Sequence, residues 1–315
     1  MLYLKDKITL LDNIYDSIGR NLEKCFLCPR ECGINRLRGE KGKCGIGKDL
    51  LIYSAFLHKG EEPPLSGKEG SGIIFFSGCN LRCVYCQNYP FSHLMKGKIV
   101  TSHKLAEIIL ILQDKGAHNI NLVTATPFLP LIVESLLVAF KKGFDLPIVY
   151  NTSGYESIST LEMLKGVIDI YLTDLKYINP HTAYKFSSAY DYPYIAKRAI
   201  KEMYQQRKNA SFYKNIMKEG IIIRHLLLPG YIEESKKILL WLKENIPSGY
   251  ISIMVQYHPY YKAYLYPEIN RRIHKEEYTA ICEFIEEIGI EKGWIQEFLP
   301  DSHLAGVYIS PQIPF

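Results

Sequence analysis

Three cysteines stand close together in the run Phe76-Ser-Gly-Cys79-Asn-Leu-Arg-Cys83-Val-Tyr-Cys86-Gln-Asn88. The C-x3-C-x2-C spacing brings three thiolates into one loop, and thiolates are ligands of zinc and of iron–sulfur clusters. Three of them cannot complete a four-cysteine zinc site, and on a 4Fe–4S cubane they leave one iron open. A zinc knuckle with a fourth ligand elsewhere is the alternative. The spacing, together with the apolar strand expected just before the loop, favours the cluster.

An open iron makes radical chemistry possible at this loop. The amino and carboxylate groups of S-adenosylmethionine (SAM) can chelate the iron, which brings the sulfonium next to the cluster. An electron from the reduced cluster can then break the sulfur–C5′ bond homolytically. The resulting 5′-deoxyadenosyl radical can abstract hydrogen from an unreactive C–H bond. In such reactions the cofactors carry the chemistry, and the protein orients and shields them.

A second group of cysteines precedes the first one along the chain. Cys25, Cys28, Cys32 and Cys44 follow the spacing C-x2-C-x3-C-x11-C, with several glycines between them that permit tight turns. Four thiolates can close a zinc site or ligate a second iron–sulfur cluster, and the sequence does not choose between the two. We expect a structural metal here that ties the N-terminal segment to the rest of the chain.

We expect these cysteines to lie in a reducing compartment. Of the 315 residues 47% are hydrophobic and 23% charged, which is typical of a globular protein with a large core. No apolar stretch resembles an export signal or is long enough to span a membrane, so we expect a cytoplasmic protein. Cysteines clustered in such a chain indicate metal ligation rather than disulfides. The net charge of +5 does not favour a nucleic-acid or membrane partner.

From about residue 70 short apolar runs alternate with helical patterns. The expected buried strands are Ile73–Phe76, Ile120–Val123, Pro147–Tyr150, Ile168–Leu172, Ile221–Leu228 and Ile251–Val255. The helical patterns between them include Ser102–Lys115, Leu129–Lys142, Ile158–Lys165 and Glu233–Asn245. Six strand–helix units predict an α/β fold, a partial (β/α)6 TIM-type barrel, with a doubly wound sheet as the alternative. In either fold the site lies at the carboxyl ends of the strands.

The chain is expected to divide into three segments. Residues 1–69 form a small N-terminal cysteine-rich lobe with a helix at about 7–23, and residues 70–265 form the partial barrel. Residues 266–315 form a helix at about Pro267–Ile288 and a tail. The linker that ends the lobe carries Glu61 and Glu62 beside two prolines. These two glutamates are candidate site residues that can face a substrate or belong to a rigid connection.

The cysteine loop resembles that of the radical SAM superfamily, and over about residues 70–260 the chain is similar to pyruvate formate-lyase activating enzymes. The stretch from Cys25-Phe-Leu-Cys28 through Gly42-Lys-Cys44-Gly45 resembles the N-terminus of an activating-enzyme-like subgroup whose substrate is not settled. The resemblance implies an oxidoreductase that cleaves SAM reductively and abstracts hydrogen, from a glycine Cα of a partner enzyme in the activases. It also implies flavodoxin or ferredoxin as the electron donor.

The resemblance carries site residues onto three strand ends. In Thr173-Asp174-Leu175-Lys176 the second and fourth residues share one side of a strand, and the resembling enzymes use a D-x-K pair there to bind SAM. A plain salt bridge is the alternative for Asp174 and Lys176. Arg224 matches an arginine near the SAM carboxylate, for which a planar guanidinium is suited. His258, in Gln256-Tyr-His-Pro259, matches a histidine that contacts SAM.

Two runs depart from the family pattern. Asn151-Thr152-Ser153-Gly154 is similar to a D-T-N-G run of the activating enzymes, but Asn151 replaces the acid, which argues against a cation site there. A turn explains the same run, because Asn and Gly favour turns. Where the activating enzymes have a G-G-E run that meets the SAM amino group, this chain has Thr124-Ala-Thr126-Pro127. Hydroxyls or carbonyls of Thr124 and Thr126 can contact SAM instead.

A protein of another class could carry the same cysteines. An iron–sulfur or zinc module that transfers electrons or recognises a partner needs only the cysteine loops. Six strand–helix units provide far more core than such a module requires. The sequence therefore favours the enzyme.

Overall fold

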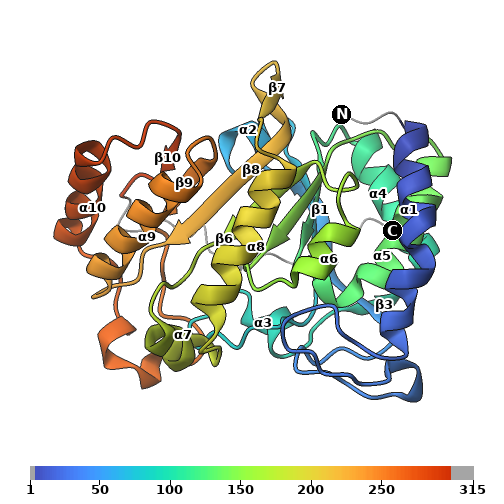
Figure 1. Ribbon diagram of the computed structural model, residues 1–315, viewed down its shortest axis with the longest axis horizontal. Coiled ribbons are helices and arrows are strands. Elements are labelled where there is room, and N and C mark those ends of the chain that lie inside the picture. Colours follow the sequence, from blue (N-terminus) through green and yellow to red (C-terminus); the bar gives the residue numbers. More distant parts are fainter. Residues whose placement is uncertain (1–3, 299–315) are drawn as a thin grey trace.

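An open sheet of mostly parallel strands organises the protein, and this computed structural model describes residues 4–298 (Figure 1). The strands lie in the order β10-β9-β8-β6-β5-β4-β2-β1-β3, with β7 paired to β8. Their bounds are β1 Leu50–His58, β2 Ser71–Phe76, β3 Lys98–Val100, β4 Ile120–Val123, β5 Ile148–Thr152, β6 Ile170–Asp174, β7 Ser211–Tyr213, β8 Ile216–Leu226, β9 Tyr250–Met254 and β10 Gly293–Ile295.

The order of the strands decides between the two predicted topologies. From β2 through β4, β5, β6, β8 and β9 to β10, neighbours in the sheet are parallel and follow the order of the chain. Every crossover therefore advances in the same direction, as in a TIM-type barrel, whereas a doubly wound sheet reverses direction near its middle. The prediction of a partial barrel is confirmed. The sheet is not closed, and β1 and β3 extend it in antiparallel fashion beyond β2.

Helices follow most of the parallel strands. Their bounds are α1 Leu4–Gly19, α2 Pro63–Ser66, α3 Tyr89–Ser92, α4 Ser102–Asp114, α5 Leu129–Lys141, α6 Ile158–Met163, α7 Pro180–Ser187, α8 Tyr192–Gln206, α9 Ile232–Asn245 and α10 Lys275–Glu287. Five short 3-10 turns complete the described elements: η1 Arg20–Leu22, η2 Arg36–Arg38, η3 Thr126–Phe128, η4 Ala263–Leu265 and η5 Pro267–Ile269.

The two faces of the sheet are packed differently because side chains alternate along each strand. On one face, strand residues such as Tyr150 and Ile223 share the main hydrophobic core with the helices. On the other face, here called the inner face, Ile170, Leu172 and Ile222 pack against Leu65 of α2. Figure 1 shows α2 at the opposite end of the sheet from α3 and α7. The inner face is thus covered near the amino ends of the strands.

The predicted elements are present, with differences at the two ends of the chain. Each predicted strand and each of the four helical patterns within the barrel overlaps an observed element within a few residues. The prediction of one helix over Pro267–Ile288 was wrong in its first part. There the 3-10 turn η5 ends at Ile269, and α10 begins only after His274, where a capping box with Glu277 satisfies the helix start. The predicted tail at 299–315 lies outside the described residues.

A buried ion pair fastens α1 to the amino end of the sheet. The Lys7 ammonium pairs with the Asp169 carboxylate and donates to the Val167 carbonyl at 3.2 Å. Burial lowers the pKa of Lys7, and the Asp169 charge opposes that shift. Asp169 also accepts a hydrogen bond from the Ile148 amide at 2.8 Å, so the same carboxylate holds the start of β5. Because an uncompensated buried charge is costly, this pair makes α1 part of the barrel's structure.

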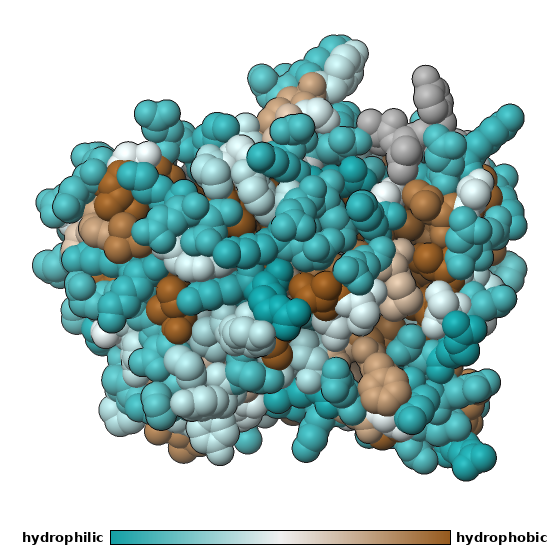
Figure 2. All heavy atoms as spheres, viewed as in Figure 1, coloured by the Kyte–Doolittle hydropathy of each residue, from teal (hydrophilic) through white to brown (hydrophobic). Residues whose placement is uncertain are grey.

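The outer surface is mainly polar. Hydrophilic residues cover most of the face in Figure 2, and hydrophobic ones reach it in small patches, one of them over α1 at the right. Among residues 4–298, every helix is too short or too polar to cross a lipid bilayer.

Candidate functional site

The loop that carries Cys79, Cys83 and Cys86 leaves β2 at its carboxyl end. It is fastened there by backbone hydrogen bonds from Gly78 to the Phe91 carbonyl at 2.9 Å and from Val84 to the Phe186 carbonyl at 2.8 Å. Gly78 adopts φ +82, where a Cβ atom would lie 2.8 Å from the Cys44 carbonyl oxygen. Only glycine fits this position without a shift of the backbone. The loop is therefore held between α3, the end of α7 and the N-terminal lobe.

The three thiols of this loop lie in a desolvated environment. Burial raises the pKa values of Cys79, Cys83 and Cys86, the last to about 11, and the charge of Cys83 raises the other two further. The Lys176 ammonium opposes the shift at all three thiols. The sulfurs thus share one small region in which a bound metal or a nearby cation is needed to stabilise thiolates.

Hydrogen-bond donors surround the sulfurs. The Ser187 hydroxyl donates to Cys83 Sγ at 3.0 Å, and the Leu81 amide donates to Cys79 Sγ at 3.4 Å. Cys86 Sγ and Ser92 Oγ lie 3.1 Å apart. Such contacts to cluster sulfurs stabilise negative charge and set reduction potentials. The sequence analysis missed the two serines, and Ser187, 104 residues from Cys83, carries no local signal that could have indicated its position.

A buried chain of hydroxyl groups continues from Ser187. Its hydroxyl lies 2.7 Å from that of Tyr177, which lies 2.6 Å from that of Tyr85. Burial raises the pKa values of both tyrosines well above their usual range, so both remain neutral donors. Tyr85 lies within the cysteine loop itself, and this position was the one feature of the sequence that could have indicated the chain of hydroxyl groups.

Thiols, hydrogen-bond donors and a cation make up this part of the site. Among residues 4–298, no three Cys, His, Asp or Glu side chains converge closely enough to hold one metal ion. The donors near the sulfurs and the Lys176 ammonium are groups that stabilise thiolate ligands of an iron–sulfur cluster.

Asp174 and Lys176 lie at the carboxyl end of β6, beside the cysteine loop. The Lys176 ammonium is 2.5 Å from the Asp174 carboxylate, and both side chains keep less than a fifth of their surface exposed. Burial would lower the pKa of Lys176, but the charges of Asp174 and Cys83 outweigh it and the pKa rises. The structure thus brings together the thiols and the D-x-K pair that the sequence analysis assigned to one site.

Arg224 lies next to this pair on the inner face. It stands opposite Asp174 in the register of β6 and β8, on the same face as Ile222. Its Nε and Nη2 donate to both carboxylate oxygens of Glu62, at 2.6 and 2.5 Å, and its Nη2 also pairs with Glu61. The two glutamates of the predicted linker thus contact Arg224, another candidate residue.

The threonines and Asn151 divide between the two faces. Asn151 follows Val149 on the inner face, whereas the hydroxyls of Thr126 and Thr152 both donate to Glu156, the first at 2.7 Å. Burial raises the pKa of Glu156 to about 7 although the hydroxyls oppose it. The side chains of the two threonines thus point toward the helix layer, where both contact the Glu156 carboxyl. Glu156 was not among the residues predicted from the sequence.

Thr124 directly follows β4 and has φ +60, a conformation that β-branched residues rarely adopt. Its amide donates to the Asn151 carbonyl at 2.9 Å, which holds the strained backbone in place. Such strain clusters at functional sites, where the surrounding structure compensates for it. Its position at a strand end is consistent with the predicted role of its backbone in binding.

His258 follows β9 in a segment that returns to the cysteine loop. The Gln87 side chain donates to the Gln256 carbonyl at 2.9 Å, and the Lys262 amide donates to the Val84 carbonyl at 2.8 Å. The His258 ring packs edge-on against Tyr260, with centroids 5.3 Å apart. The structure therefore places this histidine near the loop, as its predicted role requires.

The N-terminal lobe, residues 25–48, lies at the same end of the sheet as α3 and α7 (Figure 1). The Arg82 guanidinium donates to the Lys43 carbonyl, and Arg30 donates to the Asn80 carbonyl at 3.0 Å. The lobe thus contacts the cysteine loop directly.

The four thiols of the lobe influence one another. The pKa of Cys28 is raised to about 12, mainly by burial, and the charges of Cys44 and Cys25 contribute to this rise. A Cβ atom on Gly42 would lie 3.4 Å from Cys32 Sγ and 3.7 Å from Cys44 Sγ, so those two sulfurs flank one glycine. The buried Arg36 donates to Cys25 Sγ at 3.0 Å. A guanidinium beside several thiols provides the positive charge that a thiolate metal site favours.

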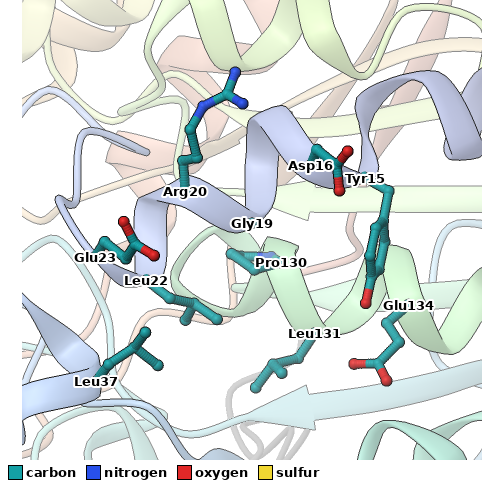
Figure 3. A pocket seen from close by; sticks show the side chains of 10 residues that line it. All are labelled: Tyr15, Asp16, Gly19, Arg20, Leu22, Glu23, Leu37, Pro130, Leu131 and Glu134. Carbon is teal, nitrogen blue, oxygen red and sulfur yellow. The ribbon is translucent and has the colours of Figure 1, made fainter.

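A surface pocket of about 390 Å³ lies elsewhere, between α1 and α5 (Figure 3). Leu22, Leu37 and Leu131 form its apolar part, and Tyr15 and Glu134 lie on its other side. It contains neither cysteine nor histidine, and Glu134 is already hydrogen-bonded to Ser102 at 2.7 Å. The pocket is therefore separate from the site at the strand ends.

The chain is similar in sequence to several known proteins. An uncharacterized protein of Methanocaldococcus jannaschii is 34% identical over 296 residues, 90% of this chain and 81% of that protein. The pyruvate formate-lyase-activating enzyme of Clostridium pasteurianum is 28% identical over 119 residues, 35% of this chain and 49% of that enzyme. The crystal structure of Streptococcus suis SuiB bound to the precursor peptide SuiA aligns with a TM-score of 0.49 at 13% identity. That alignment covers 70% of this chain and 46% of SuiB.

The family model of the Radical SAM superfamily matches residues 73–255, more than half of the chain. The matched segment begins in β2 and ends just after β9, so it contains the cysteine loop, Asp174, Lys176 and Arg224. This chain belongs to the Radical SAM superfamily.

Proposed function

We propose that this protein binds a 4Fe–4S cluster through Cys79, Cys83 and Cys86 and cleaves SAM reductively to abstract hydrogen from a substrate. The observation that carries the proposal is the set of three thiols, one buried and two partly buried, beside the Asp174–Lys176 pair at one end of a partial barrel. When bound and reduced, such a cluster supplies the electron that breaks the sulfur–C5′ bond of SAM.

The residues of the chain have defined tasks in this proposal. The three thiolates hold three irons, and the donors on Ser187, Ser92 and the Leu81 amide stabilise their charge. Asp174 and Lys176 offer an acceptor and a donor to the charged groups of SAM, next to the thiols. The low exposure of these groups limits water, which strengthens each charged contact.

We further propose that the hydrogen donor is a glycine Cα of a partner protein and that a flavodoxin or ferredoxin supplies the electrons. The similarity to an activating enzyme supports this choice. The match covers about half of that enzyme. The substrate is therefore inferred from a segment shared with that enzyme and not from its whole length.

We also propose that Cys25, Cys28, Cys32 and Cys44 hold a second metal, either zinc or an iron–sulfur cluster. The mutual influence of their thiols and the buried Arg36 beside Cys25 support this site. Because the lobe contacts the cysteine loop of β2, its metal would fix the position of that loop.

The direct test is the release of 5′-deoxyadenosine. Anaerobically reconstituted, dithionite-reduced protein should form it from SAM, and Cys83→Ala should not, because one iron loses its thiolate. Chromatography of the nucleoside products measures the outcome. Circular dichroism should show the same secondary structure in both proteins, since the core does not depend on this side chain.

Two outcomes would contradict the proposal. Wild-type protein that holds a cluster but releases no 5′-deoxyadenosine would instead be an electron-transfer or partner-binding module. Full turnover by Cys83→Ala would remove the assigned cluster site.

The Ser187 hydroxyl should raise the reduction potential of the cluster. Its hydrogen bond to Cys83 stabilises the reduced, more negative state most, so Ser187→Ala should lower the potential by roughly 20–40 mV. A redox titration followed by electron paramagnetic resonance measures the shift. Tyr177→Phe is the matched control, because it keeps the Ser187–Cys83 bond and should change the potential less. An equal shift in both variants would show that packing, not this hydrogen bond, sets the potential.

The lobe should depend on its metal for stability. Cys28→Ala should lose the lobe metal and melt roughly 5 °C or more below wild type, because metal binding there is coupled to folding. SAM cleavage at the barrel cluster should persist. Cys282→Ala, on α10 and outside both groups, should retain metal and melting temperature. A stable Cys28→Ala protein whose barrel cluster cannot be reduced would indicate a redox relay instead.

A further inference from the structure

Five charged side chains form one connected group on the inner face. Lys176 pairs with Asp174, Asp174 stands opposite Arg224 in the strand register, and Arg224 binds Glu61 and Glu62. Adjacent strands are only about 4.8 Å apart, so the group is continuous from the cysteine loop inward. Two positive and three negative groups leave one negative charge when all are ionised.

The excess charge is confined to the two glutamates. Their side chains are each 6% exposed and share a single guanidinium. Burial raises the pKa of Glu61 to about 7, and Glu62 contributes to this rise, whereas Arg224 outweighs burial and lowers the pKa of Glu62. Near neutral pH the pair therefore holds a fractional proton on Glu61.

The other groups around the glutamates do not cancel this charge. Burial and the nearby Arg224 lower the pKa of His58, which leaves it neutral. Ser252 lies opposite Arg224 on β9 and forms a hydrogen bond with Glu62. Its hydroxyl is uncharged and cannot neutralise the carboxylate. A ligand that carries a positive charge and lies over Asp174 and Lys176 would thus compensate an existing negative charge.

We propose that Glu61 and Glu62 make the SAM site select the positively charged sulfonium of SAM over the neutral thioether of S-adenosylhomocysteine. This inference rests on the proposed function. At neutral pH SAM has an ammonium, a sulfonium and a carboxylate, and so one net positive charge. S-adenosylhomocysteine lacks the sulfonium and therefore has no net charge. The glutamates act as specificity-determining residues through their field, and Arg224 holds them in position.

The selectivity should be linked to a proton. A cation near Glu61 favours its ionised form, so binding of SAM should displace the proton that the pair holds at neutral pH. SAM affinity should therefore rise as the pH rises through the Glu61 pKa. S-adenosylhomocysteine should bind without this proton release.

Calorimetry on the anaerobic holoenzyme, with the cluster oxidised so that SAM stays intact, tests the inference. Wild type and Glu61→Gln are each titrated with SAM and with S-adenosylhomocysteine, in two buffers of different ionisation enthalpy. The loss of a unit charge at a largely buried position changes the affinity for a nearby cation on the order of tenfold. Glu61→Gln should thus weaken SAM by about tenfold, leave S-adenosylhomocysteine unchanged and abolish proton release. Glu69→Gln, exposed in the same segment, should change none of these.

The alternative outcomes are distinct. Equal weakening of both ligands by Glu61→Gln, or no effect on either, would overturn the selectivity and leave the proposed function intact. Glu62→Gln provides a second variant if Glu61→Gln fails to assemble its cluster, and it should also reduce the preference for SAM. Wild-type holoenzyme that binds neither ligand would overturn the proposed function and this inference with it.

Discussion

Desolvation of three thiols beside one ammonium group is the constraint on which the site depends. Desolvation favours the protonated forms of Cys79, Cys83 and Cys86 unless positive charge reaches them, and the Lys176 ammonium lowers the pKa of all three. Lys176 in turn needs Asp174 to stay charged at that depth. The neighbouring contacts extend the same balance, from hydroxyl donors around the sulfurs to the carboxylates around Arg224.

The topology makes this balance possible. Crossovers that all advance in one direction bring the carboxyl ends of successive strands to one edge of the sheet. The cysteine loop after β2 and the charged residues near the ends of β6 and β8 therefore meet although they are far apart in sequence. The lobe and α7 hold the loop from outside, and α2 covers the inner face from the opposite end.

The sequence revealed the parts of the site that depend on local spacing. Three cysteines within eight residues, or an acid and a lysine two positions apart on a strand, are visible without a structure. The Arg224–Glu62 pair joins residues 162 positions apart, and its existence depends on how α2 enters the inner face. The Ser187 hydroxyl was equally hidden, because it reaches Cys83 only through the packing of α7 against the loop.

The fold was predictable to a similar degree. The parallel strands β2, β4, β5, β6, β8 and β9 were predicted because each lies in a short buried apolar run near a helix. The parallel strand β10 was missed because it has only 3 residues and is partly exposed. The antiparallel β1 was missed because an apolar run alone does not distinguish an added strand from other buried segments. The start of the last helix was placed at Pro267, whereas that residue begins the short 3-10 turn η5 and the helix begins at the capping box of His274 and Glu277.

The central claim is that SAM chelates an open iron of a cluster held by Cys79, Cys83 and Cys86. Electron–nuclear double resonance of the reduced cluster, frozen before SAM is cleaved and with SAM isotopically labelled at its amino nitrogen and carboxylate oxygen, tests this contact without any substrate. The account predicts coupling of both labelled atoms to the electron spin of the cluster. A reduced cluster that shows neither coupling in the presence of saturating SAM would contradict it.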